Sequence, residues 1–116
     1  MALCNFSEKI LNECRAHAQA NSDIESCGLI LKYRPLVFFP MKNVLHSDSR
    51  FEMHKETFLI KNKIHTIFHS HPYSIAYPSE EDFRKSRSLN IPYLIYSCMH
   101  DNFIYFNLKK CIPIKV

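Results

Sequence analysis

Two helical patterns alternate with strand-like segments along this chain, and this alternation limits the fold more than any other feature of the sequence. Residues 7–20 are typical of an amphipathic helix capped by Ser7. Its apolar face consists of Ile10, Leu11, Cys14 and Ala18. Residues 79–89 predict a second helix capped by Ser79, and residues 55–63 predict a short third helix from a weaker pattern.

The remaining apolar segments are rich in β-branched and aromatic residues, which favour strands. We expect strands at residues 25–33, 36–40, 51–53, 64–71, 91–98 and 103–108. The first two are separated by Arg34-Pro35, which indicates a tight turn. Helices interspersed with strands in this order predict an α/β fold, a mixed β-sheet flanked by helices. At 116 residues, the chain has the size of a single domain, residues 1–116.

Composition and charge exclude several classes of protein. Hydrophobic residues make up 47% of the chain and charged residues 22%, which is typical of a folded soluble domain. The net charge of +4 comes from scattered Lys and Arg without a basic run, so we expect no nucleic acid partner. A mildly basic surface would also suit an acidic protein partner.

The location of the chain is predicted from what its sequence lacks. No segment approaches the roughly 18 consecutive apolar residues of a membrane span, and the N-terminus has no signal-peptide pattern. The five cysteines are widely spaced and form no Cys-x-x-Cys pair. They are Cys4, Cys14, Cys27, Cys98 and Cys111. We therefore expect no membrane association and a reducing, cytoplasmic location.

The most informative segment has the pattern His-x-His, seven residues, Ser, two residues, Asp. Residues two apart on a strand point to the same face, so His69 and His71 can present two imidazoles to one metal ion. The loop that follows has a proline near each end, and it would return the next helix over the strand end, with Asp82 as a third ligand. His65 would share the strand face, but about 13 Å away, so we interpret it as a second-shell or surface histidine.

Two imidazoles, one carboxylate and an open fourth position are typical of a catalytic zinc, whereas structural zinc is usually closed by four ligands rich in Cys. We therefore predict one Zn²⁺ per chain. The hydroxyl of Ser79 could donate to the oxyanion that forms on a carbonyl under attack. An alternative interpretation is a capping box of Ser79 and Asp82, which is common without any metal, and both interpretations could hold together.

The segments Glu25-Ser26-Cys27-Gly28 and His69-Ser70-His71-Pro72 through Ser79 to Asp82 together resemble the JAMM motif of the Mov34/MPN/PAD-1 (JAB, MPN-plus) metallopeptidases. The resemblance spans nearly the whole chain in the right order, including Asn43 and Phe51 between the two motifs. It is strongest to the compact bacterial, archaeal and phage members. The RadC branch has Asn where this chain has Ser70, so we set that branch aside.

The resemblance implies a cytidine-deaminase-like JAMM/MPN fold and a role for each motif residue. His69, His71 and Asp82 match the zinc ligands, and Ser79 matches the serine that assists the tetrahedral intermediate. Glu25 matches the general base, although by itself it would be a solvated carboxylate at a strand start. The implied substrate is a protein or peptide, with the cut at the tail of a ubiquitin-like or sulfur-carrier protein or in a phage tail-associated peptide.

Two other functions compete with hydrolysis of an amide bond. A noncatalytic MPN-type scaffold for protein interactions would share the fold, but such scaffolds typically lack one or more ligands, and this chain lacks none. A zinc nucleobase deaminase would require the combined signature of His-x-Glu and Pro-Cys-x-x-Cys, which is absent because the sequence contains no Pro-Cys-x-x-Cys. Neither the identity of the substrate nor the oligomeric state follows from the sequence.

Overall fold

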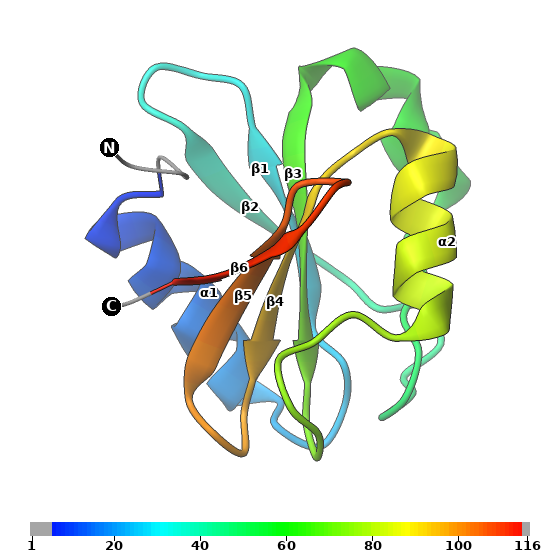
Figure 1. Cartoon of the computed structure of the whole chain (residues 1–116). Helices are drawn as coiled ribbons and strands as arrows, with labels where there is room; N and C mark the ends of the chain where they lie inside the picture. The colour runs from blue at the N-terminus through cyan, green and yellow to red at the C-terminus, as the bar shows by residue number, and fades with distance from the viewer. Residues whose placement is uncertain (1–5, 115–116) are drawn as a thin grey trace.

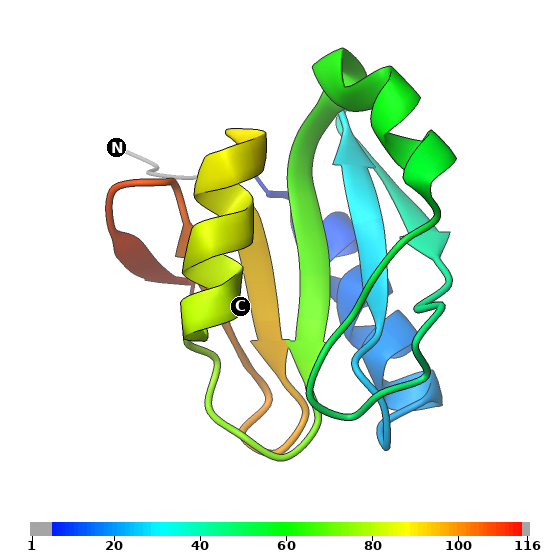
Figure 2. The same ribbon diagram turned by 90° about the vertical axis from the view of Figure 1, so that its right-hand side faces the viewer.

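A computed structural model describes residues 6–114, which form a six-stranded sheet with helices on both faces (Figures 1 and 2). The elements in chain order are α1 (Glu8–Ala20), β1 (Cys27–Leu31), β2 (Val37–Met41), the 3-10 segment η1 (Lys55–Lys63), β3 (Ile64–His71), α2 (Glu80–Leu89), β4 (Tyr93–Ser97), β5 (Asn102–Phe106) and β6 (Cys111–Ile114). Across the sheet the order is β2-β1-β3-β4-β5-β6, with only the β3–β4 pair parallel among these strands. The prediction of an α/β fold with a mixed sheet flanked by helices is confirmed. None of the helices in this part of the chain is long and apolar enough to cross a bilayer.

The two faces of the sheet bury separate apolar cores. The Ser7 side chain caps α1 by accepting a hydrogen bond from the Ile10 amide at 3.2 Å, and the predicted apolar stripe of this helix covers one face. The other face packs against α2 and η1, and its core includes Ile67, Tyr93 and Ile95. Because successive residues of a strand point to opposite faces, the central strand β3 contributes Phe68 to the first core and Ile67 to the second.

The strands differ most from the sequence prediction at three places, besides shifts of one or two residues at other strand ends. The predicted strand at residues 51–53 is wrong: this segment is extended but pairs with no strand, and Phe51 and Met53 alternate inward as in a half-buried strand. The sequence analysis missed β6, because Pro113 argues against a strand unless the strand lies at an edge, as β6 does. The first strand begins at Cys27 rather than residue 25, so Glu25 precedes the sheet.

An irregularity in β3 separates His65 from the other strand histidines. Ile30 of β1 pairs with Thr66 and Leu31 pairs with Ile64, so the register skips His65. A bulged residue of this kind loses the regular alternation of faces. The His65 ring contacts Phe6 at 5.9 Å, beside the α1 core. The prediction that His65 shares the face of His69 and His71 is therefore wrong.

Gly28 of β1 is required by the close approach of β2. A Cβ atom at this position would lie 2.4 Å from the Phe38 ring and 3.0 Å from the Phe39 carbonyl oxygen. The Phe38 ring would have to move, and the strand carrying the Phe39 carbonyl would have to yield slightly.

We predict that Gly28→Ala lowers the free energy of unfolding by about 2 kcal/mol, within the range for overpacked cores. Chemical denaturation measures this change. Since the clash is with the Phe38 ring, Phe38→Leu in the same chain should restore part of the loss, so that the two substitutions together cost less than their sum. Strictly additive costs would contradict the proposed contact.

Candidate metal centre

The C-terminal end of β3 places two histidines on the face of the sheet covered by α2. His69 and His71 alternate with Ser70, so both rings point toward α2 while Ser70 points toward the α1 side. The rings are almost completely buried, with exposed fractions of 0% and 6%. Their Nε2 atoms lie 3.2 Å apart.

Antiparallel pairing brings Glu25 to the same place. Cys27 pairs with His69, and the chain before Cys27 therefore continues beside the end of β3. Two hydrogen bonds extend this pairing, from the Ser26 amide to Ser70 Oγ at 2.8 Å and from the Ser70 amide to the Ser26 carbonyl at 2.9 Å. Glu25 is thus held beside both imidazoles, and its side chain is buried.

The start of α2 supplies the third group. Asp82 Oδ2 lies 3.1 Å from His69 Nε2 and 3.3 Å from His71 Nε2. The same oxygen accepts a hydrogen bond from the Ser79 amide at 3.0 Å, while Ser79 Oγ accepts one from the Asp82 amide at 3.1 Å. This is the capping box that the sequence suggested, and it fixes the carboxylate against the histidine pair.

The hydrogen bonds around His71 determine which atoms face the site. A carbonyl oxygen only accepts, so the contact of 2.9 Å between His71 Nδ1 and the Ile75 carbonyl requires a proton on Nδ1. Neutral His71 therefore presents the lone pair of Nε2 to His69 and Asp82. His69 has no such partner on Nδ1, so its Nε2 either donates a proton toward His71 and Asp82 or, with a cation between them, presents a lone pair as they do.

The pKa shifts of Asp82, His71 and Glu25 are consistent with the close approach of these groups. Burial opposes the charge of Asp82, but His69, His71 and the Ser79 amide outweigh it and hold the pKa of this carboxyl well below its ordinary value. Burial likewise opposes the charge of His71, yet the hydrogen bond with Asp82 raises the pKa of His71 overall. Burial raises the pKa of Glu25, and the two histidines only partly offset this effect.

The three converging atoms fit a small divalent metal. Ligand atoms about 2.0–2.1 Å from a tetrahedral zinc lie about 3.3 Å apart, and the pairs formed by His69, His71 and Asp82 measure 3.1 to 3.3 Å. The ligand atoms of Glu25, His69 and His71 lie within 4.8 Å of one another, but Glu25 forms no ion pair with either ring among the described residues. Both carboxylates, Asp82 in contact with the imidazole nitrogens and Glu25 beside them, therefore lie within reach of a metal ion held by the two histidines.

Ser79 lies at the exposed start of α2, three residues before Asp82. Its Oγ uses a lone pair for the Asp82 amide, which leaves the hydroxyl proton available to another acceptor. The capping role is therefore compatible with the predicted role toward an oxyanion. All five residues that the sequence singled out, Glu25, His69, His71, Ser79 and Asp82, thus meet at one end of β3.

Two residues gain a role only from the structure. The buried Asn43 side chain donates to the carbonyls of Glu25 and Arg50 and accepts from the amides of Leu45 and Glu52, which holds the loop that carries Glu25. Both Asn43 and Phe51 belong to the sequence resemblance, but no periodicity or spacing assigns them a contact.

Phe51 orients His69 by ring stacking. Its ring lies parallel to the imidazole at a centroid distance of 4.5 Å, and Tyr93 meets the imidazole edge-on at 5.3 Å. His69 Nδ1 is buried and has no hydrogen-bond partner among the described residues. Metal-binding histidines are usually oriented by a hydrogen bond from this second nitrogen, so at His69 the aromatic rings have to serve that purpose.

Comparison with known proteins gives the family. A sequence profile described as prokaryotic homologs of the JAB domain matches residues 7–107. The chain belongs to this family. Comparison with curated protein sequences gives no match.

The fold of this JAB-domain protein is similar to that of a solved structure. The solution structure of protein DSY2949 from Desulfitobacterium hafniense superposes with a TM-score of 0.67 over 94% of this chain and 88% of that chain, at 24% sequence identity. At this identity the likeness supports the fold alone.

We predict that this JAB-domain protein binds one metal ion per chain, and that His69→Ala or Asp82→Ala abolishes binding. Elemental analysis of protein purified with zinc measures the stoichiometry. The exposed His100 is the matched control, since His100→Ala should leave the metal content unchanged. Full metal content in both site variants would contradict the ligand assignment.

The same experiment should show a dependence on pH. The raised pKa of His71 means that protons compete with the metal already above the ordinary histidine range. Metal affinity should therefore fall steadily as pH decreases through that pKa, and metal retained at pH near 4 would argue against histidine ligands.

We predict that Phe51→Ala weakens zinc binding about tenfold, because the buried Nδ1 of His69 has no hydrogen-bond partner among the described residues and Phe51 is the ring that stacks on the imidazole. Competition with a chromogenic chelator measures the affinity. Phe51→Leu restores volume without stacking and should recover stability more than affinity. Phe39→Ala removes an exposed aromatic residue from β2 and serves as the control. Unchanged affinity in Phe51→Ala would show that stacking does not orient His69.

Proposed function

We propose that this chain is a zinc-dependent metallopeptidase that hydrolyses an amide or isopeptide bond of a protein or peptide substrate. The observation that carries the proposal is the convergence of His69 Nε2, His71 Nε2 and Asp82 Oδ2 at 3.1 to 3.3 Å beside a buried glutamate. Membership of the JAB-domain family supports it. Two imidazoles and one carboxylate are ligands that suit zinc.

Each residue of the site has a distinct role in the proposed hydrolysis. His69, His71 and Asp82 would hold the metal, which supplies Lewis-acid activation of water when bound. Glu25 accepts a proton from the attacking water and returns it to the amine that leaves. The raised pKa of Glu25 suits both steps, because a base is most effective when its pKa approaches the working pH.

Ser79 acts on the substrate carbonyl. Its hydroxyl donates a hydrogen bond to the carbonyl oxygen as negative charge develops there. The hydroxyl is fixed by the capping box, so little reorganisation accompanies the reaction. The tail of a ubiquitin-like or sulfur-carrier protein is the first substrate to test, and a phage tail-associated peptide is the second.

We expect Glu25→Gln to lower kcat by about 10² to 10⁴-fold while leaving the metal content and fold intact. The amide has nearly the shape of the carboxylate but cannot accept the proton. Cleavage of a ubiquitin-like protein with an amide-linked C-terminal reporter measures the effect. Glu13→Gln on the exposed surface of α1 is the matched control.

The results of these cleavage assays distinguish a peptidase from a noncatalytic scaffold. Parental activity in Glu25→Gln would exclude Glu25 as the base. A metal-loaded parent chain that cleaves none of these substrates, while binding one of them, would favour the noncatalytic scaffold.

A further inference from the structure

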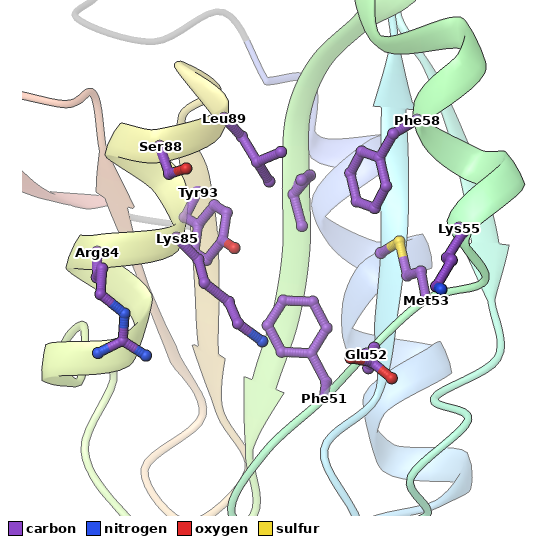
Figure 3. A pocket seen from close by; sticks show the side chains of 11 residues that line it. Phe51, Glu52, Met53, Lys55, Phe58, Arg84, Lys85, Ser88, Leu89 and Tyr93 are labelled. Atoms are coloured by element: carbon purple, nitrogen blue, oxygen red, sulfur yellow. The ribbon is translucent and has the colours of Figure 1, made fainter.

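An apolar pocket lies beside the metal centre, between α2 and the segment of residues 51–58 (Figure 3). Its volume is about 490 Å³, within the roughly 300–1,000 Å³ of typical ligand sites. The walls are formed by Phe51, Met53, Phe58 and Leu89. None of the proposed metal ligands lines it, so it is a separate cavity.

The hydroxyl of Tyr93 points into this pocket. Tyr93 is 1% exposed, and Figure 3 shows its oxygen directed into the space between α2 and Phe51. The hydroxyl has no hydrogen-bond partner among residues 6–114. Its oxygen is not fully enclosed by the protein, so an acceptor that enters the pocket can reach it. A tyrosine hydroxyl carries its proton at neutral pH, so it is available as a donor.

The rim of the pocket is positively charged. Lys55, Arg84 and Lys85 line it together with a single acidic residue, Glu52. Glu81 lies 3.4 Å from Lys85 and 3.7 Å from Arg84, but it also bonds Arg50, and one carboxylate cannot neutralise three cations. An occupant that carries negative charge is therefore favoured.

Phe51 connects the pocket to the metal centre. One face of its ring stacks on His69 at 4.5 Å, and the ring also lines the pocket, where the Lys85 amine lies 6.0 Å from its centroid. A peptide chain whose side chain fills the pocket would therefore pass close to the site of hydrolysis.

We propose that this pocket binds an apolar side chain of the substrate that is accompanied by a carboxylate. The apolar group packs between Phe51, Phe58 and Leu89, an oxygen of the peptide or carboxylate accepts from the Tyr93 hydroxyl, and Arg84 and Lys85 attract the negative charge. The statement that the occupant is a substrate rests on the proposed hydrolase function. The preference of the pocket for apolar groups that carry negative charge is independent of that function. The substrate class is then a peptide segment that combines apolar and acidic residues.

Binding of small probes tests the pocket without any reaction. The probe is N-acetyl-phenylalanine, compared with its uncharged amide and with N-acetyl-glycine, and the readout is the backbone amide shifts of the zinc-loaded and metal-free protein. We expect N-acetyl-phenylalanine to bind most tightly in both forms and to move the amides of Ser88, Leu89 and Tyr93. Shifts confined to His69 and His71 in the zinc-loaded form, or no shifts up to the solubility limit, would overturn the proposal.

Two variants locate the probe. Tyr93→Phe removes only the unpaired hydroxyl and should weaken N-acetyl-phenylalanine about tenfold, the loss expected for a hydrogen bond to a charged acceptor. Ser88→Trp, at an exposed position of α2 on the pocket rim, should close the cavity and abolish binding. Unchanged affinity in both variants would place the probe elsewhere.

Peptide cleavage assays then test whether the occupant of the pocket is a side chain of the substrate. With any peptide that the protein cleaves, replacing an apolar-acidic pair by serine and lysine should raise KM more than it lowers kcat. Arg84→Glu should reduce this preference for acidic peptides, whereas Lys109→Glu, an exposed residue between β5 and β6, should not. A protein that binds the probe but cleaves nothing would refute the hydrolase alone. Cleavage without preference between the two peptides would refute the pocket's role in substrate binding.

Discussion

The antiparallel pairing of β1 with β3 decides where Glu25 lies relative to the two histidines of the candidate metal centre. Because Cys27 pairs with His69, the residues before β1 and after β3 emerge at the same end of the sheet. Glu25, 44 positions before His69 in the sequence, thereby becomes its neighbour, and the reciprocal bonds of Ser26 and Ser70 hold the two segments together. A slip of one residue would turn both histidines toward α1 and leave Glu25 without its partners.

The capping box of α2 both stabilises the start of the helix and fixes the position of Asp82 in the site. Asp82 Oδ2 accepts the Ser79 amide and also faces both histidine nitrogens, so one oxygen serves two purposes. A helix N-terminus attracts negative charge, which together with the histidines keeps this carboxylate ionised. The position of a candidate ligand therefore depends on a local motif of four residues, and the loop before it needs only to bring that motif over the end of β3.

The extended segment before η1 connects the metal centre with the neighbouring pocket. Asn43 satisfies backbone groups on both sides of this segment, and Phe51 then lies between His69 and the cavity. An unpaired segment can place its side chains independently of a sheet register, whereas a strand would have to keep its alternation. This freedom lets one aromatic ring contact the imidazole on one side and the pocket on the other.

The sequence by itself determined the helices, most strands and the ligand pattern, because these depend on short spacings: two residues along a strand for His69 and His71, and three along a helix for Ser79 and Asp82. It could not determine that residues 51–53 stay unpaired, that β6 completes the sheet, or that a bulge separates His65 from His69, because strand pairing depends on distant partners. Tertiary structure alone decided three features: the position of Glu25 beside the histidines, the stacking of Phe51 on His69, and the direction of the Tyr93 hydroxyl into the pocket. Each depends on segments that are distant in the sequence, and no periodic pattern of residues predicts which distant segments will meet.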